Sequence, residues 1–211
     1  MMPLPIDSPV RYFAEFIEGR RGEILDAALG VFAEKGYEGG TMREIAAAVG
    51  VSEPALYRHY AGKEALFEEL VSLAGDRIVS VARGMIAGVR PENLRESLSL
   101  LIEARRAAAT GHESPVIRML LVSAPHSGVF LTTFRAHLAT PMAAMLAELV
   151  PRVDGYFGHT YTPAETTDRV RAFMSLFIGH FMTSMVLGTA PTDDATVNAM
   201  LKIMDWVEQR Y

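Results

Sequence analysis

The amino-acid sequence predicts an all-helical protein, and three observations support this prediction. Apolar residues recur at the three- and four-residue spacing of amphipathic helices along almost the whole chain. No pair of alternating apolar and polar segments flanks an Asn-Gly or Asp-Gly turn, so β-hairpins are not indicated. Clusters of glycine and proline divide the helical pattern into about nine segments, and they fall at residues 36–40, 50, 61–62, 90–91, 111–115, 125–128, 151–163 and 191–192.

The composition narrows the class of protein. The chain has 211 residues, of which 50% are hydrophobic, enough for a small domain joined to a larger one. It contains no cysteine, which excludes disulfides, thiol nucleophiles and thiolate metal sites and is typical of a reducing cytosol. We therefore expect a cytoplasmic location. The net charge of −5 gives no overall sign of affinity for nucleic acid, so any DNA-binding surface must be local.

Two segments of the chain lie where a targeting sequence or a membrane span could be expected. Residues 1–19 contain three prolines and no uninterrupted apolar stretch, so we expect an N-terminal arm rather than a secretory signal. Residues 172–190 carry no formal charge over a length close to that of a membrane span. Polar residues such as His180 interrupt this segment, which favours a helix buried inside the protein and no membrane partner.

The first firmly predicted helix covers residues 20–35. Its apolar residues fall on one face, and Gly36 ends it. Thr41 and Glu44 then match a capping box, in which the threonine hydroxyl and the glutamate carboxylate satisfy the unpaired amides of a helix start. We therefore expect a new helix to begin directly after Thr41.

A second short helix follows closely. Gly50 has the position of a C-terminal glycine in the left-handed conformation, and Ser52 is suited to cap the next helix. Pro54 falls in the first turn of that helix, where a missing N–H costs little. Two helices of about eight residues, braced by a preceding helix, form a helix-turn-helix that can place one helix in a DNA major groove.

Residues 41–67, TMREIAAAVGVSEPALYRHYAGKEALF, resemble the DNA-binding signature of the TetR family of transcriptional regulators. The resemblance covers about residues 20–67 and includes the run Leu56-Tyr57-Arg58-His59-Tyr60 and the pair Lys63-Glu64. It implies an N-terminal three-helix DNA-binding domain over residues 20–67. It also implies that residues 68–211 form a larger helical domain for ligand binding and dimerisation.

The resemblance further implies roles for individual residues. Hydroxyl, imidazole and ammonium groups at helix starts fix the register on DNA phosphates, and a guanidinium can bind guanine through two hydrogen bonds. Arg58 is accordingly the candidate for reading a base. The residues expected at phosphates are Thr41, Tyr57, His59 and Lys63, those expected near base edges are Glu53, Ala55 and Arg58, and Arg43 and Ser52 complete the DNA-binding set.

Some of these residues also have structural interpretations. Thr41 is first a helix cap, Tyr60 is expected to pack at the edge of the core, and an isolated histidine such as His59 is more typical of a surface. Residues 20–64 contain six Lys or Arg and seven Asp or Glu, so the module is not basic overall. Glu53 suits the helix dipole but repels phosphate, and it can accept a hydrogen bond from cytosine. We expect salt-sensitive binding with modest nonspecific affinity.

The residues that flank the motif allow more than one interpretation. Gly62 stands where the family usually has a capping Ser or Asn, which weakens that cap by about a few tenths of a kcal/mol. Arg11, Arg20 and Arg21 either extend the DNA footprint as a mobile arm or are simply solvated.

Beyond Phe67 no motif of similar specificity occurs. Sulfur and aromatic side chains there are suited to an apolar ligand cavity, although ordinary core packing explains them almost as well. His180 is the most suggestive polar group because it interrupts an uncharged helix. The residues expected at a ligand are Arg105, Met119, Phe130, Phe134, His137, Met142, Phe173, Met174, Phe177 and His180.

The last two helices are expected over residues 163–188 and 192–210. Both have wide apolar surfaces, and the first has two apolar stripes that need two different partners. The TetR resemblance implies that these helices pack with their symmetry mates in a homodimer that reads a pseudo-palindrome. An ordinary intramolecular core is the alternative.

The motifs of the common hydrolases, nucleotide-binding proteins and zinc proteases are missing, so no enzyme activity, cofactor or metal is predicted. The sequence thus predicts a repressor that binds double-stranded operator DNA and is released by a small, largely apolar effector. One alternative is a helix-turn-helix protein that shapes DNA without a ligand. A helical enzyme is the other.

Overall fold

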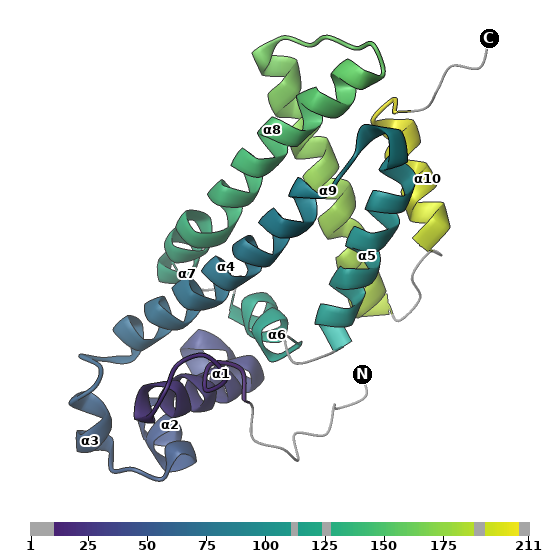
Figure 1. The fold of residues 1–211 in the computed structure, drawn as a ribbon. Helices are drawn as coiled ribbons and strands as arrows, with labels where there is room; N and C mark the ends of the chain where they lie inside the picture. The colour runs from purple at the N-terminus through teal and green to yellow at the C-terminus, as the bar shows by residue number, and fades with distance from the viewer. Residues whose placement is uncertain (1–10, 111–113, 124–127, 188–192, 207–211) are drawn as a thin grey trace. The chain divides into compact units, whose positions relative to one another are not determined.

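The computed structural model describes residues 11–110, 114–123, 128–187 and 193–206 (Figure 1). Within these ranges every regular element is helical, which confirms the all-helical prediction. The chain divides into two compact units. The first contains the described residues of Met1–Arg77 and Thr110–His137, and the second contains those of Ile78–Ala109 and Leu138–Tyr211.

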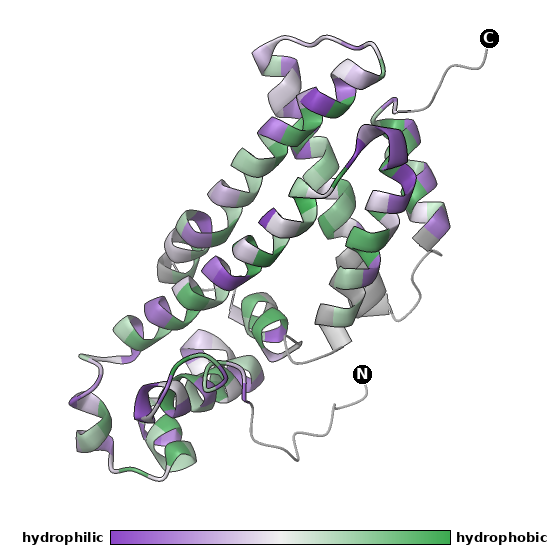
Figure 2. Cartoon of the chain, in the orientation of Figure 1, coloured by the Kyte–Doolittle hydropathy of each residue, from purple (hydrophilic) through white to green (hydrophobic). Residues whose placement is uncertain are grey.

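The first unit is built around its N-terminal helix. Its helices are α1 (Arg20–Gly39), α2 (Met42–Val49), α3 (Glu53–Tyr57), the first part of α4 (Lys63–Ala87), α6 (Ser114–Ser123) and α7 (Gly128–Phe134). The largely apolar α6 packs along α1 (Figure 2). Fully buried side chains from four of these helices meet in the core, namely Ile24, Leu25, Leu29, Phe32, Ile45, Leu56 and Phe67.

The chain before α1 is packed into this unit from its first described residues. Tyr12 and Phe13 are buried, and the Asp26 carboxylate accepts hydrogen bonds from their amides at 2.9 and 2.6 Å. The Arg77 guanidinium lies over the rings of Tyr12 and Phe16. Part of the segment that we expected to be an arm is therefore fixed in the domain, while residues 1–10 lie outside the described residues.

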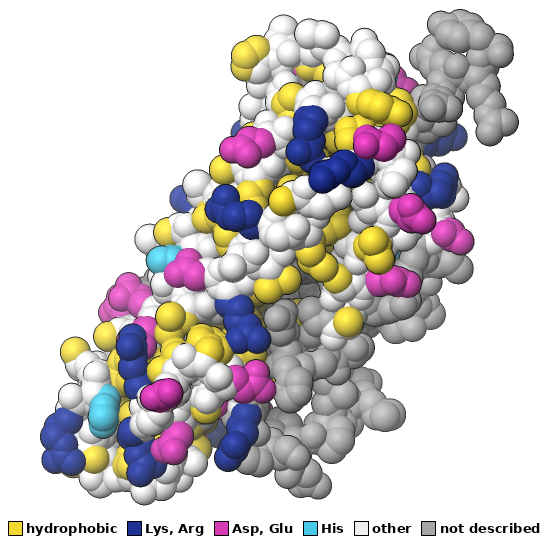
Figure 3. All heavy atoms as spheres, viewed as in Figure 1, with side chains coloured by type: hydrophobic (Ala, Val, Ile, Leu, Met, Phe, Trp, Pro, Cys, Tyr) yellow, Lys and Arg dark blue, Asp and Glu magenta, His cyan; other side chains and the backbone are white. Residues whose placement is uncertain are grey.

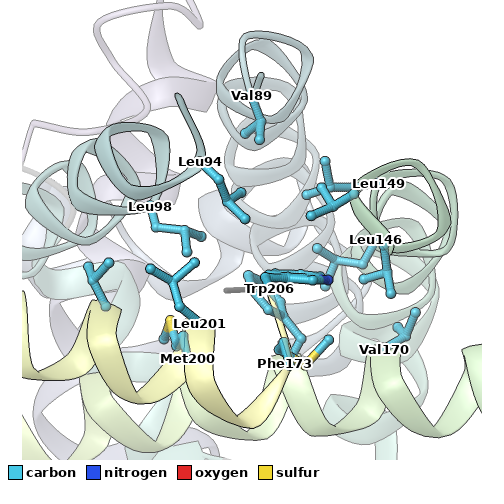
Figure 4. Packing of buried hydrophobic residues seen from close by; sticks show 14 of the residues in the cluster. Val89, Leu94, Leu98, Leu146, Leu149, Val170, Phe173, Met200, Leu201 and Trp206 are labelled. Carbon is cyan, nitrogen blue, oxygen red and sulfur yellow. The ribbon is translucent and has the colours of Figure 1, made fainter. Parts of the chain in front are cut away.

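The second unit contains the remaining helices. They are the rest of α4, the 3-10 turn η1 (Pro91–Asn93), α5 (Leu94–Thr110), α8 (Thr140–Tyr156), α9 (Pro163–Leu187) and α10 (Asp193–Ile203), and the π-helical turn η2 (Arg135–Ala139) precedes α8. α8 and α9 lie side by side, and α10 contacts α9 (Figure 1). Figure 4 shows the core of this unit, where the rings of Trp206 and Phe173 have centroids 5.7 Å apart.

One boundary differs from the sequence prediction between residues 128 and 156. We expected a single helix there ending at Pro151, but the structure has α7, η2 and then α8, so one more α-helix results. α8 continues through Pro151 to Tyr156. Pro151 removes one helical hydrogen bond, but its ring is exposed and the buried neighbours Val150 and Val153 hold the helix against the core.

The last helix also ends earlier than predicted. α10 ends at Ile203, and Asp205 has the left-handed φ of 55°. The Trp206 amide donates to the Leu201 carbonyl at 2.8 Å and the Asp205 amide to the Lys202 carbonyl at 3.2 Å, the pattern of a Schellman motif. The chain turns so that Trp206 enters the core, and residues 207–211 lie outside the described part.

A buried ion pair holds this turn in place. Asp154, at the end of α8, is 1% exposed and accepts hydrogen bonds from Arg169 Nε at 3.0 Å and Nη2 at 2.5 Å. The Trp206 indole nitrogen donates to the same carboxylate at 2.6 Å, and Arg169 also donates to the Met204 carbonyl. The segment after α10 is thereby fixed to α8 and α9.

The helix that contains most of the uncharged segment is α9. Across the described ranges, no helix has both the length and the hydropathy that a membrane span requires. Residues 188–190, the end of that uncharged segment, lie outside the described residues.

Candidate nucleic-acid interface

The capping box at the start of α2 is formed as predicted. Thr41 Oγ1 accepts from the Glu44 amide at 3.3 Å, while the Glu44 carboxylate accepts from the Thr41 amide at 3.0 Å and from its hydroxyl at 2.7 Å. Lys35 Nζ lies 2.6 Å from the second Glu44 oxygen. The hydrogen bonds from Lys35 and then from Thr41 lower the pKa of Glu44 to about 2. The single hydroxyl proton of Thr41 is thus engaged by Glu44.

The turn between α2 and α3 also follows the prediction. Gly50 has φ 76°, and the amides of Gly50 and Val51 donate to Ala47 and Ala46 in a Schellman motif. Ser52 Oγ accepts from the Ala55 amide at 3.4 Å and caps α3. α3 has 5 residues, fewer than the expected eight, because the chain tightens after Tyr57 and the amides of Arg58 and His59 donate to carbonyl groups only three residues back.

The side chains of α3 and its last turn divide into a buried and an exposed set. Leu56 is fully buried and Tyr60 is 6% exposed, which confirms the expectation that Tyr60 packs against the core. Tyr57 is 47% exposed, and Arg58 and His59 are exposed. The other residues of the expected DNA-binding set around this helix are the exposed Ser52 and the half-buried Glu53 and Ala55.

Half of the six basic side chains in residues 20–64 form ion pairs within the protein. Figure 3 shows Lys and Arg side chains interleaved with Asp and Glu side chains over the N-terminal helices. Salt bridges join Arg20 to Glu23, Arg21 to Glu69 and Lys35 to Glu44, at 2.7, 2.7 and 2.6 Å. Within the described ranges no ion pair is found for the exposed Arg43 or Arg58. These two guanidinium groups are therefore the most available to an anionic partner.

Lys63 has a different environment from the other expected phosphate ligands. Its ammonium group donates to the carbonyl oxygens of Tyr37, Glu38 and Gly40 at 2.8, 3.3 and 3.2 Å. It also lies over the Tyr37 ring, 4.5 Å from the centroid. Its contacts are thus to the end of α1 and the chain that leads into α2.

One bridge near the site was not found from the sequence. The Glu69 carboxylate accepts from Arg21 Nε at 2.7 Å and from the Tyr60 hydroxyl at 3.1 Å. Burial, and then the Glu69 charge, raise the pKa of Tyr60 to about 12. Arg21 is therefore bound to α4 and not part of a mobile arm. Glu69 lies outside the helix-turn-helix motif, so no local signal pointed to it.

The residues expected at a ligand are spread over both units. Met119, Phe130, Phe134 and His137 belong to the first, Met142, Phe173, Met174, Phe177 and His180 belong to the second, and the side chain of Arg105 lies outside the described residues. Met119, Phe130 and Phe173 are at most 3% exposed and pack as core residues. The Phe173 and Phe177 rings stack with centroids 6.4 Å apart.

The two expected histidines have hydrogen-bond partners on neighbouring helices. His180 Nδ1 lies 2.8 Å from Thr196 Oγ1 and joins α9 to α10. His137 Nδ1 lies 3.1 Å from both Ser72 Oγ and Asp76 Oδ1 on α4. Both imidazoles thus have structural contacts.

A small hollow is present in the first unit beside the end of α1. It has a volume of about 60 Å³ and is lined by Lys35, Gly36, Tyr37, Glu38, Val122 and Ser123. The residues expected at a ligand do not line this hollow.

Comparison with known proteins places this geometry in a family. Residues 24–70 match the profile of bacterial regulatory proteins of the tetR family. The chain is 30% identical over 167 residues to the HTH-type transcriptional repressor AcnR of Corynebacterium efficiens, a match that covers 69% of this chain and 84% of the relative. The HTH-type transcriptional repressor KstR2 of Mycobacterium tuberculosis is 33% identical over 101 residues, and the chain spans about half the length of that relative.

Solved structures share the fold over most of the chain. A transcriptional regulator from Pseudomonas aeruginosa PAO1 superposes with a TM-score of 0.73 at 19% identity, covering 95% of this chain and 96% of the other. FadR from Bacillus subtilis, crystallised with stearoyl-CoA, gives a TM-score of 0.67 at 17% identity and covers 86% and 96%. The order and packing of the helices are therefore those of known regulators.

Proposed function

Because the chain belongs to the TetR family of bacterial regulatory proteins, we propose that it is a transcriptional repressor that binds operator DNA and is released by a small ligand. Regulators of this family are not enzymes, in agreement with the sequence prediction. The observation that best supports the proposal is the set of exposed side chains at α3 and in the turn after it. Tyr57 is exposed on α3 and Arg58 and His59 are exposed in the turn that directly follows it, while the buried Leu56 and Tyr60 fix the same segment to the core.

The proposed DNA contacts follow from exposure and pairing. Arg58 reads a base edge, because its guanidinium is exposed and has no carboxylate partner in the part of the chain that is described. Tyr57 and His59 bind phosphate oxygens beside it, and Arg43 does so from the first turn of α2. Glu53 and Ala55 lie near base edges, while Ser52 and Thr41 act chiefly as caps that hold α3 and α2.

We place the DNA-binding domain at residues 20–67 and the ligand-binding and dimerisation domain at 68–211, in a protein of the cytoplasm. The homodimer forms through α9 and α10. Most apolar residues of α10 are buried in its own core, so the dimer contacts use the remaining outward residues, among them Ile178 at 45% and Ile203 at 57% exposure. A two-fold dimer presents two α3 helices to the two halves of a pseudo-palindrome.

The ligand is proposed to be small and largely apolar. The partly buried Met174 and Phe177 of α9 pack at the edge of the second core and provide adaptable contacts for such a molecule. FadR of Bacillus subtilis, which has the same fold, was crystallised with stearoyl-CoA, so long-chain acyl compounds are a suitable first set to test. The ligand acts by binding more tightly to a conformation with low operator affinity.

The test is a footprint of the purified protein on the DNA upstream of its own coding sequence, with and without acyl-CoA compounds. A protected palindrome that is lost on adding a compound supports the proposal. Failure to protect or select any duplex contradicts the repressor function. Protection that no compound relieves favours the DNA-shaping alternative.

A point variant tests the assignment of the base contact. Arg58→Ala is expected to weaken operator binding by about 1–3 kcal/mol and to relax sequence preference at one base position. The measurement is a set of binding isotherms on operators substituted at each position. A uniform loss across all sequences would reassign Arg58 to a phosphate.

A further inference from the structure

We propose that Lys63 is a positioning residue, which holds the end of α1 against the start of α4 and so sets the placement of α2 and α3, and that it does not bind a DNA phosphate. The proposal rests on the repressor function proposed above. It differs from the role that the motif assigns to this lysine.

The hydrogen-bond donors of Lys63 are engaged within the protein. A lysine ammonium has three N–H groups. Lys63 directs these donors to three carbonyl oxygens, those of Tyr37, Glu38 and Gly40, at 2.8, 3.3 and 3.2 Å. A phosphate could be bound only after at least one of these bonds is broken.

Lys63 also joins the ends of two helices whose dipoles favour opposite charges, the C-terminal end of α1 and the N-terminal end of α4. Lys63 is the first residue of α4, where a positive charge is unfavourable unless it is directed elsewhere. The basic residue before the Gly36 interruption, Lys35, is bound to Glu44, and the carbonyl groups at the end of α1 attract a cation. The side chain of Lys63 directs its positive charge to these carbonyl groups.

The chain segment that Lys63 binds leads directly into α2. Gly36 interrupts α1 with φ 70° and ψ 175°, and the next residues turn toward Lys63. The Tyr37 ring lies against the ammonium, 4.5 Å from centroid to Nζ. Thr41, the cap of α2, directly follows the held carbonyl of Gly40. The three hydrogen bonds of Lys63 thus form a clamp on the chain before α2. Loosening this clamp frees the start of α2, and α3 follows α2 through a three-residue turn.

The experiment compares Lys63→Met, Lys63→Arg and Arg43→Met in the full-length protein, on a duplex that the wild type selects from a random pool. Operator affinity is measured over a range of salt concentrations, and hydrogen exchange is measured without DNA. Loss of one phosphate contact lowers the salt slope by about 0.9. Arg43→Met, an exposed cation without an ion-pair partner in the described chain, is the matched control for such a loss.

If Lys63 is a positioning residue, Lys63→Met weakens operator binding by roughly tenfold or more, which is the scale expected when charge-assisted hydrogen bonds are lost. Its salt slope falls by less than about half of the single-contact value. Amides of residues 36–46 exchange faster in the free protein. Lys63→Arg restores binding only in part, because a planar guanidinium cannot place three donors from one nitrogen on three carbonyl groups.

Two results would overturn the proposal. A slope that falls as far as in Arg43→Met, with full rescue by arginine and unchanged hydrogen exchange, identifies a phosphate contact, since arginine binds phosphate well. Faster exchange with unchanged operator affinity identifies a structural role without effect on DNA placement. If the wild type selects no duplex, the repressor function fails, and unchanged hydrogen exchange in Lys63→Met would then reject the clamp independently.

Discussion

Two helices of the protein, one in each unit, start with the same capping box. Thr41 and Glu44 form it before α2, and Thr162 and Glu165 form it before α9. The hydroxyl-to-carboxylate distance is 2.7 Å and the amide-to-hydroxyl distance is 3.3 Å in both boxes. The box before α9 has no expected DNA contact, so helix capping alone is sufficient reason for the geometry at Thr41.

The units also share a second feature. In each, a buried aspartate binds a chain segment outside the helices, before α1 in the first unit and after α10 in the second. Asp26 accepts from the amides of Tyr12, Phe13 and Ala14 before α1. Asp154 binds Arg169 and Trp206 and so fixes the chain after α10.

The two units differ in the exposed cations that lie near these capping boxes. After Thr41 come the exposed Arg43 and the α3 face with Arg58, neither paired with an acid in the described chain. After Thr162 the exposed Arg171 is paired with Asp168 at 3.2 Å. The capacity to bind an anion is therefore indicated by unpaired cations and not by the cap.

The largest expected effect compares the two buried aspartates. Asp154→Ala leaves Arg169 nearly buried and without its partner, which should lower the free energy of unfolding by about 3–5 kcal/mol. Asp26→Ala leaves backbone amides without a charged acceptor and should cost about 1.5–3 kcal/mol. Urea unfolding measures both.

The control for this comparison is Asp168→Ala, which removes an exposed ion pair and should cost about 0–1 kcal/mol. A larger loss for Asp26→Ala than for Asp154→Ala would show that the N-terminal segment contributes more to stability than the buried ion pair.

Structural features that depend on a few neighbouring residues could be predicted from the sequence. The box of Thr41 and Glu44, the left-handed Gly50 and the Ser52 cap each depend on contacts within four residues, and all three are present. The burial of Leu56 and Tyr60 follows from the same short pattern. The predicted elements of the helix-turn-helix were therefore correct apart from the length of α3.

Contacts between distant residues could not be predicted in this way. Lys63 binds the Tyr37 carbonyl 26 positions earlier, and Trp206 binds Asp154 52 positions earlier. Such pairs leave no periodic signal, because either partner alone is compatible with an exposed or solvated side chain. The same reason explains why α6 was not expected to join α1 in one unit.

The second-largest expected effect compares the stability and the operator affinity of variants at the two capping threonines. Thr41→Val and Thr162→Val each remove a capping hydroxyl and should each lower the free energy of unfolding by about 1 kcal/mol. Operator affinity should fall for Thr41→Val alone, since only that cap orients α2 and the turn to α3. Thermal melts and binding isotherms on the two variants test this. Equal losses of affinity would show that overall stability, and not local orientation, limits DNA binding.

The smallest effect is the pH response of the two glutamates in these boxes. Hydrogen bonds from Lys35 and then Thr41 lower the pKa of Glu44 to about 2, and those from Thr162 lower the pKa of Glu165. A lowered pKa in the folded state means that each carboxylate stabilises the fold above its ordinary pKa of 4.5, and that this stabilisation is lost as the pH falls through the folded-state value.

The carboxyl chemical shifts of both residues, followed from pH 6 downward by NMR, test this response. Glu44 should titrate below Glu165, because Glu44 has an ammonium partner at 2.6 Å and no such partner of Glu165 is found among the described residues. Lys35→Met should raise the Glu44 midpoint toward that of Glu165, and high salt should do the same in part because the pair is exposed. A Glu44 midpoint that does not move in Lys35→Met would mean that the ammonium does not hold this carboxylate in solution, and that the cap alone lowers its pKa.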